Sequence, residues 1–481
     1  MLVFAFTLSI GGLVPQSGFA ENTIILPEIG DSSDSLLSPT QEQELGAAFF
    51  RSLYGNIRIN QDLEIDDFIE SLGERLAVNS DNPFQSFHFF VVIDPAINAF
   101  AGPGGYIGVN SGLILITESE SELASVVAHE IGHVTQRHLY RAFEAARRLT
   151  IPSAAALLAA ILIGTQSPQL GQAAIIAAQA GSAQYQIDFT RNNEQEADRV
   201  GMQNLARSNF DPRAMPAFFE RLDRSSRYYG EGPPEFLRTH PVTASRVSDT
   251  RGRAEKFPYR QFLDSTTYLL MKAKLHVLTG IKPSQVIQYF ESRLERGTDT
   301  QKAVADYGYG LALAAGGETS RARSILQALA QQNPEQPAFI NALARVESES
   351  GNNETALNLY TRAIDKFPNN RAIALDYSAT LLRAEKYEAA RQLLNDYLRN
   401  HKPTPELYEL LSNAYGNLGQ RAQSHRFLAE SYYLSGQTEP AIQHARLALE
   451  NTEGNHYLTA LLEDRLKVFV TEEEERKQQE N

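Results

Sequence analysis

The stretch A-S-V-V-A-H-E-I-G-H-V-T-Q-R-H, residues 124–138, places two histidines and a glutamate in a mostly apolar, helix-forming segment. His129 and His133 are four residues apart, so on an α-helix both side chains project from one face. Glu130 directly follows the first histidine. In the pattern H-E-x-x-H the two histidines bind zinc and the glutamate acts as a general base. The stretch therefore predicts a metal site built on a helix.

The residues around this pattern also favour a helix. Ser119 precedes an acidic turn, Glu120 to Glu122, which is typical of a capped helix start. Apolar residues then recur at helical spacing, namely Leu123, Val126, Val127, Ile131 and Val134. Gly132 lowers helix propensity by about 1 kcal/mol, so we expect close packing against it.

A catalytic zinc site needs a third protein ligand and one open position. The polar stretch 188–201 contains Glu194 and Asp198, four residues apart and on one helical face. Glu194 can complete a His₂Glu set for one zinc per chain, and Asp198 can accept a hydrogen bond from a ligand imidazole. Glu196 points about 200° away from Glu194, so it is not expected to bind the same ion.

His138 is an alternative third ligand that the spacing disfavours. Metzincins place a third histidine six residues after the second, with a glycine between. His138 follows His133 by five residues, and Gln136 stands at the glycine position. We therefore expect His138 beside the metal ligands or at the surface.

Length and composition limit the class of protein. A chain of 481 residues suggests two or three domains. The net charge of −14 argues against nucleic acid as a main partner, because phosphate binding needs a basic face. The absence of cysteine excludes Cys₄ zinc sites and thiol catalysis and suits an oxidising compartment.

Two apolar segments bear on location. Residues 1–20 predict a signal peptide cleaved after Ala20, with Gly18 and Ala20 as the small residues of the cleavage site and 21–40 as an N-terminal extension. No Lys or Arg precedes the apolar run, so its n-region is weak or the true start lies elsewhere; a buried strand is the alternative. Residues 149–181 predict two apolar helices joined by a turn at 164–168, with a hairpin that contacts membrane as the alternative.

From about residue 267 the sequence repeats with a period of 34 residues, typical of tetratricopeptide units. Aligned positions carry similar residues: Ala322, Ala356 and Ala390; Ile325, Leu359, Leu393 and Phe427; Gly310, Ala344, Ser378 and Ser412. We expect four units across 303–438, an imperfect one near 267–300 and a degenerate one near 439–465. Tyrosines in this stack supply either partner contacts or core, namely Tyr309, Tyr377, Tyr408, Tyr415 and Tyr432. The charged tail 466–481 is predicted to be disordered.

Together these motifs resemble the M48 family of zinc metallopeptidases, which pairs H-E-x-x-H with E-x-x-x-D, here residues 129–133 and 194–198. Residues 98–110 resemble the strand before the zinc helix, and Thr239-His240-Pro241 with Arg246 resembles the family's T-H-P…R element. The resemblance implies a mainly α (α+β) fold. A zincin-like metalloprotease domain with a small β-sheet would span 41–255, followed by a linker at 256–266 and an α-solenoid of tetratricopeptide repeats at 267–465.

The mechanism predicted from the ligand set is peptide hydrolysis. A His₂Glu zinc centre activates a water and polarises the scissile carbonyl, while Glu130 transfers the proton. By resemblance, Arg246 or His240 donates to the oxyanion. The resemblance also implies that His240, after the loop 228–234, can occupy the open metal position and silence the enzyme; an exposed loop histidine is the alternative.

The glycine-rich stretch from Gly104 to Val109 is expected to hold substrate. Proteases bind extended chains through main-chain hydrogen bonds, and glycine lets another backbone approach closely. We expect Gly104, Gly105, Tyr106, Ile107, Gly108 and Val109 to form a free edge beside the zinc. A core strand and turn is the alternative.

The members of the family that carry C-terminal repeats imply a periplasmic endopeptidase for quality control of outer-membrane β-barrel proteins. It would degrade misassembled substrates and promote assembly. Its partners would be unfolded or stalled outer-membrane proteins and, through the repeats, the barrel-assembly machinery. Peripheral membrane contact would come from the apolar segment 149–181. The main alternative is a mostly non-proteolytic chaperone or adaptor. A secreted protease that needs an activator is a weaker one.

Overall fold

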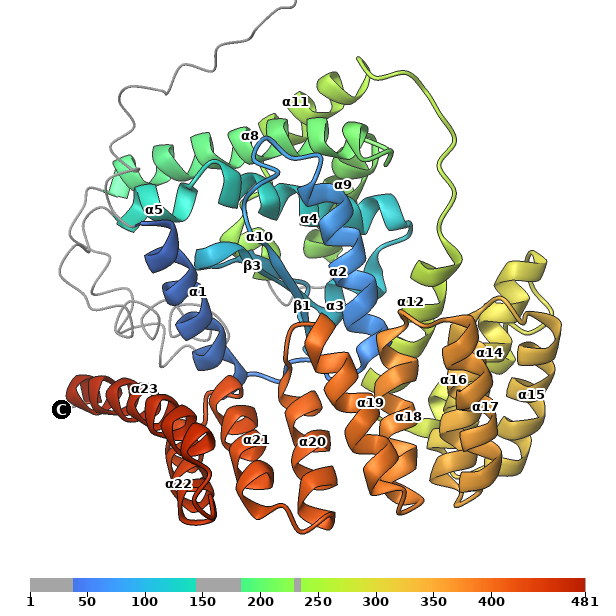
Figure 1. Cartoon of the computed structure of the whole chain (residues 1–481). Coiled ribbons are helices and arrows are strands. Elements are labelled where there is room, and N and C mark those ends of the chain that lie inside the picture. Colours follow the sequence, from blue (N-terminus) through green and yellow to red (C-terminus); the bar gives the residue numbers. More distant parts are fainter. Residues whose placement is uncertain (1–37, 144–182, 229–234, 481) are drawn as a thin grey trace, which may run out of the picture.

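The computed structural model describes residues 38–143, 183–228 and 235–480. Within these ranges the chain is mainly helical, with one small sheet in its N-terminal half and a stack of helix pairs beside that half (Figure 1). The predicted fold class is confirmed. The predicted signal peptide, most of the N-terminal extension, the apolar pair at 149–181 and the loop 229–234 lie outside the described residues.

The described sheet has three strands in the order β1-β3-β2. They are β1 (His88–Val92), β2 (Ala99–Ala101) and β3 (Tyr106–Asn110). β1 runs parallel to β3 with His88 opposite Tyr106, and β2 runs antiparallel with Ala101 opposite Ile107. β2 and β3 therefore form a hairpin, and β3 is the central strand.

The glycines of this hairpin serve its turn. Gly104 and Gly105 lie in the short helix η2 (Pro103–Gly105) with φ of 66° and 79°, a region that favours glycine. A Cβ on Gly105 would lie 2.1 Å from the carbonyl oxygen of Ser86. A tight turn and a close backbone neighbour thus account for the glycine-rich sequence.

The expectation that residues 104–109 form a free edge is wrong. Gly104 and Gly105 belong to the turn, while Tyr106, Ile107, Gly108 and Val109 lie in a strand paired on both sides. Three of these strand residues are buried. Among the described strands, the edge on the hairpin side belongs to β2.

The metal-motif helix α4 (Glu120–Thr135) begins as its sequence predicts. The Ser119 hydroxyl accepts a hydrogen bond of 3.2 Å from the backbone N–H of Glu122. The helix is buried along nearly its whole length, because it lies between the sheet and other helices. Its packing partners include α2 (Leu63–Ala77), α8 (Ala183–Arg207) and α9 (Ala214–Tyr228).

The remaining helices of the N-terminal half are shorter or peripheral. They are α1 (Pro39–Tyr54), α3 (Ser111–Ile116), α5 (His138–Phe143), α10 (Glu235–Thr239) and α11 (Ala244–Ala254). α1 packs on the η2 turn, and α11 packs on α8 and α9. Within the described ranges, none of the helices combines the length and apolar character needed to cross a bilayer.

The C-terminal helices form an arc beside the N-terminal half (yellow to red in Figure 1). The arc starts with α12 (Thr266–Thr279) and α13 (Pro283–Glu291). Four helix pairs follow: α14 (Asp299–Ala315) with α15 (Thr319–Gln332), α16 (Pro337–Glu349) with α17 (Asn353–Lys366), α18 (Arg371–Arg383) with α19 (Tyr387–Asn400), and α20 (Pro405–Asn417) with α21 (Arg421–Leu434). The arc ends with α22 (Thr438–Glu450) and α23 (His456–Glu480). Gly310, Ala344, Ser378 and Ser412, the predicted small positions, are all buried.

The expectation of a disordered tail is wrong for the described residues up to 480. They form the end of α23, which is anchored at Phe469, a fully buried side chain, and at Glu472. The Glu472 carboxylate accepts hydrogen bonds from Arg51 of α1, at 3.0 and 2.8 Å, and from the Tyr433 hydroxyl, at 2.7 Å. Long-range partners thus order a segment whose local composition favours disorder.

The first part of the arc meets the N-terminal half along a seam, defined here as the contact of α2 with α12, α16 and α18. Lys274 of α12 is buried there and pairs with Asp62, at 2.7 Å, and with Glu64. Arg345 of α16 also pairs with Asp62, at 3.2 Å. Together with Arg51 and Glu472, these pairs tie both ends of the arc to the N-terminal half.

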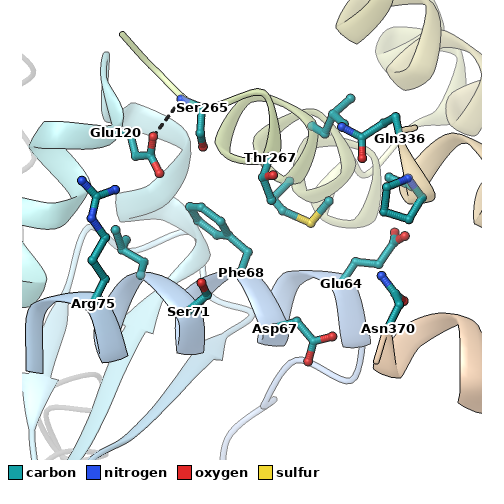
Figure 2. A pocket seen from close by; sticks show the side chains of 15 residues that line it. Glu64, Asp67, Phe68, Ser71, Arg75, Glu120, Ser265, Thr267, Gln336 and Asn370 are labelled. Carbon is teal, nitrogen blue, oxygen red and sulfur yellow. Dashed lines mark hydrogen bonds between the residues drawn. The ribbon is translucent and has the colours of Figure 1, made fainter. Parts of the chain in front are cut away.

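A cleft of about 440 Å³ opens at the seam (Figure 2). It is floored by apolar side chains such as Phe68 and bordered by polar ones such as Gln336 and Asn370. At one end the Ser265 N–H donates a 2.8 Å hydrogen bond to Glu120, drawn as a dashed line. None of the cleft's lining residues is a predicted metal ligand, so the cleft is separate from the predicted metal site.

Candidate metal centre

Four side chains that the sequence singled out converge in the N-terminal half. His129, His133, Glu194 and His240 each offer one donor atom, and these atoms all lie within 4.8 Å of one another. The Nε2 atoms of His129 and His133 are 3.1 Å apart, and each lies 3.4 Å from an oxygen of Glu194. Two helices, α4 and α8, therefore supply two imidazoles and a carboxylate that face one point.

Backbone contact between α4 and α8 makes this convergence possible. A Cβ on Gly132 would lie 3.1 Å from Cα of Ala197, and a Cβ on Gly201 would lie 3.2 Å from the carbonyl carbon of Ala128. A glycine of each helix thus meets an alanine of the other. The close packing expected at Gly132 is confirmed.

His240 follows α10 and lies within the cluster. Its Nδ1 is 3.0 Å from Oε1 of Glu194 and 3.4 Å from Nε2 of His129. The side chain is buried, which excludes the alternative of an exposed loop histidine. His240 is thus placed as a fourth donor.

Glu130 lies next to these donors without a hydrogen bond of its own. It is 1% exposed, and neither carboxylate oxygen has a hydrogen-bond partner among the described residues. Nε2 of His240 lies 3.5 Å from its Oε1. A buried carboxylate without a hydrogen bond is costly, so the position of Glu130 indicates a functional role.

Asp198 contacts the ring nitrogen of His129 that points away from the cluster, as predicted from its spacing. Its Oδ1 lies 3.0 Å from Nδ1 of His129, so Nε2 remains turned toward the cluster. Burial opposes a charge on His129, but the hydrogen bonds and charges of Asp198 and Glu194 outweigh it and raise the pKa of His129 to about 10. Burial lowers the pKa of His133 despite Glu194, which favours its neutral form.

Arg246 lies behind the carboxylates, and its contacts favour a positioning role over the oxyanion donor that the resemblance implies. Its Nε and Nη2 donate to both oxygens of Asp198 at 2.7 Å. Its Nη1 lies 2.8 Å from Glu194 and donates to the Pro241 carbonyl at 3.0 Å. The guanidinium is 2% exposed and its donors are engaged, so it positions Asp198 and Glu194.

His138 and Glu196 form a contact that the sequence did not predict. Nδ1 of His138 lies 2.9 Å from Nδ1 of His133, and its Nε2 lies 3.1 Å from Oε2 of Glu196. The chain reverses between α4 and α5 at Arg137, which has a φ of 54°. Helix periodicity carries no signal for such a reversal. The sequence correctly excluded Glu196 from the cluster.

The charges and donor types fit a divalent cation. Glu130, Glu194 and Asp198 carry three negative charges, and Arg246 supplies one positive charge next to two of them. A 2+ ion balances the remainder, and the raised pKa of His129 reflects the same excess of negative charge. Two imidazoles and one carboxylate with a further position beside them match catalytic zinc sites such as His₂Glu.

Comparisons with known proteins agree with this geometry. Residues 66–254 match Peptidase family M48, and residues 304–335 and 348–414 match tetratricopeptide repeats. A Beta-barrel assembly-enhancing protease of Yersinia pestis is 36% identical over 418 residues, covering 87% of this chain and 86% of that relative. One from Escherichia coli K12 is 35% identical, covering 90% and 88%. A mitochondrial metalloendopeptidase OMA1 of Arabidopsis thaliana is 33% identical over 162 residues, covering 34% and 30%.

Proposed function

Since this chain belongs to peptidase family M48 and is a metalloendopeptidase, we propose that it is a zinc enzyme of the periplasm with a role in barrel assembly. Its substrates are misassembled or stalled outer-membrane β-barrel proteins. The names of the relatives support the substrate class. The repeats, which suit extended segments or partner loops, support contact with the barrel-assembly machinery. Peripheral contact with the membrane rests on the apolar sequence of residues 149–181, which lie outside the described residues.

The ligands in this proposal are His129, His133 and Glu194, which hold one zinc ion per chain. Bound zinc lowers the pKa of a water ligand and polarises a peptide carbonyl. The two histidines bind through Nε2, because their Nδ1 atoms face Asp198 and His138. Both imidazoles are then neutral and carry their proton on Nδ1.

Glu130 is the general base. Its oxygens are buried and have no hydrogen-bond partner in the described part of the chain, so a carboxylate oxygen can accept a proton from the attacking water and deliver it to the leaving amine. Arg246 and Asp198 hold Glu194 and His129 in place while this occurs.

His240 is the plug of the resting site. Its Nδ1 points at the donors of His129 and Glu194, where an open coordination position belongs in an active enzyme. Displacement of His240 by a substrate would then precede cleavage. Edge strand β2 beside α4 is the place where an extended substrate can add its backbone, since β3 is paired on both sides.

The convergence of four donors within 4.8 Å, next to a buried Glu130 that has no hydrogen-bond partner among the described residues, carries the proposal. The test is Glu130→Gln, which keeps the shape of the side chain and removes the base. We expect cleavage of an unfolded β-barrel protein to fall at least 10²-fold, as general-base loss typically gives, with one zinc still bound. Cleavage at an undiminished rate, or no zinc in the unmodified protein, would contradict it.

A second candidate function is that of a chaperone or adaptor whose proteolytic site is mostly blocked by His240. The donor contacts of His240 favour it, because a plugged site leaves the repeat surface as the active part. Cells that carry Glu130→Gln distinguish the two. Retained support of barrel assembly favours the adaptor, and loss of all cellular effect favours the protease.

A further inference from the structure

His138 is a buried imidazole that is not one of the four converging donors. It connects one of them, His133, to the carboxylate of Glu196. One ring nitrogen, Nδ1, lies 2.9 Å from Nδ1 of His133, and the other, Nε2, lies 3.1 Å from Oε2 of Glu196. The side chain is 4% exposed. Because both nitrogens have polar neighbours, the placement of its proton is determined by those neighbours.

The donor and acceptor roles along this connection can be worked out in order. His133 binds metal through Nε2 in the proposed site, so its Nδ1 carries a proton and must donate. Nδ1 of His138 must then accept, which leaves the proton of a neutral His138 on Nε2, from where it donates to Glu196. The opposite tautomer would turn two N–H groups toward each other and a lone pair toward a carboxylate.

The two ligand histidines are therefore supported in parallel ways. Asp198 contacts His129 directly, whereas Glu196 reaches His133 through an imidazole. The side chain of Asp198 is 1% exposed and that of Glu196 is 30% exposed. The intervening His138 thus allows the second carboxylate to stay partly in solvent, where its charge is less costly.

We propose that His138, oriented by Glu196, is a positioning residue for His133 that fixes its tautomer and ring orientation for zinc binding. The inference rests on the proposed function, since it concerns the same zinc. It adds two residues to the support of the site and assigns each hydrogen bond a direction. Contacts of this kind typically contribute 10- to 100-fold to metal affinity.

Arg141 offers a matched control. Its Nη1 donates to the same Oε2 of Glu196, at 3.3 Å, from the partly exposed face of the carboxylate. Arg141→Ala therefore disturbs Glu196 without removing the connection to His133. His138→Gln is the conservative variant, because its amide retains one acceptor and one donor.

The test measures zinc affinity of the full chain by competition with a chelator, together with thermal unfolding of metal-free protein. We expect His138→Ala to weaken zinc binding 10- to 100-fold, Glu196→Ala to weaken it in the same direction, and His138→Gln to restore part of it. Arg141→Ala should stay within about threefold of the unmodified protein. The metal-free melting temperature of Glu196→Ala should match that of Arg141→Ala.

Equal zinc affinity in Glu196→Ala, Arg141→Ala and the unmodified chain would overturn the inference. A loss in Glu196→Ala that is matched by a loss of metal-free stability would also overturn it, because a folding role would then suffice. If the unmodified chain itself bound no zinc, the proposed function would fail instead, so the two failures are distinguishable.

Discussion

Gly132 of α4 and Ala197 of α8 are in backbone contact, since a Cβ on Gly132 would lie 3.1 Å from both Cα and the carbonyl oxygen of Ala197. This contact sits one residue from His133 and three residues from Glu194, on the two helices that supply the proposed ligands. The spacing of the two helices therefore fixes the distance between imidazole and carboxylate donors.

The first prediction follows from that contact. Gly132→Ala should push α8 away from α4, because the atoms that the new methyl meets are backbone and cannot rotate aside. We expect zinc affinity to fall at least tenfold, even though alanine favours helix by about 1 kcal/mol. Zinc competition and urea unfolding of the purified chain measure both effects.

Gly252→Ala is the control for this prediction. Gly252 lies inside α11, and a Cβ there would meet no atom of the described residues within 4 Å. The control should raise the free energy of unfolding by up to about 1 kcal/mol and leave zinc affinity unchanged. Unaltered zinc binding in Gly132→Ala would refute the role assigned to the helix spacing.

The second prediction concerns Arg246. Arg246→Lys keeps the charge but cannot reproduce the two-pronged contact with Asp198, so we expect zinc affinity to fall about 10- to 100-fold. An oxyanion donor would behave differently, lowering kcat while zinc binding stayed intact. Arg221→Lys, which disturbs the contact of Arg221 with Glu122 away from the cluster, should leave zinc affinity as it is.

The third prediction concerns the plug. His240→Ala should speed cleavage of an unfolded protein several-fold, because the open position no longer has a competing imidazole. Zinc should bind somewhat more weakly with one donor fewer. His276→Ala, a half-buried histidine on α12 next to Tyr289, serves as the control. If rate and zinc affinity both stay unchanged in His240→Ala, the plug does not exist.

The fourth prediction tests the seam. Lys274→Met removes the buried cation between Asp62 and Glu64, so less positive charge remains to balance the two buried carboxylates. Breaking a buried pair in this way costs about 3–5 kcal/mol, so the free energy of unfolding should fall strongly. Proteolysis of residues 256–265, which connect α11 and α12, should accelerate. The surface pair of Lys366 with Glu335 gives the contrast: Lys366→Met should change stability by less than about 1 kcal/mol. Equal effects in both variants would argue against the seam.

The fifth prediction is a dependence of stability on pH. Burial raises the pKa of Asp66 to about 7, although Asn60 and Arg371 act in the opposite direction. Below about pH 4 the carboxyl is protonated in folded and unfolded chain alike. As pH rises toward 7 the folded state binds the extra proton, so stability falls by up to about 1.4 kcal/mol per unit and then levels off.

Asp66→Asn should remove that slope between pH 4 and 7. Urea unfolding at intervals of one pH unit, compared with the unmodified chain, measures it. Asp81→Asn at the partly exposed pair with Arg207 should leave the slope in place. A slope that survives Asp66→Asn unchanged would assign the dependence to other groups.

Local spacing predicted much of the site and of the repeats. Residues four apart on a helix face one way, so His129 with His133, and Glu194 with Asp198, could be paired from sequence. The period of 34 residues gave the helix pairs because every repeat contacts its neighbours in the same manner.

Contacts between distant residues could not be predicted this way. Strand order decides which edge is free, and β3 became central only because β1, more than ten residues earlier, pairs with it. Arg246 turns its donors toward Asp198, 48 residues away, and Lys274 reaches Glu64, 210 residues away. The helical tail depends on Arg51 in the same manner. A pattern within one segment contains none of these partners.

Attachment of the arc at both ends has a practical consequence for dissecting the protein. A chain cut between α11 and α12 would leave Asp62 and Glu64 of the N-terminal fragment without Lys274, and Arg51 without Glu472. Such a fragment differs from the intact protein in its surface charge and in the support of α1 and α2. Rates measured on this fragment would not represent the intact protein, so kinetic measurements require the full-length chain.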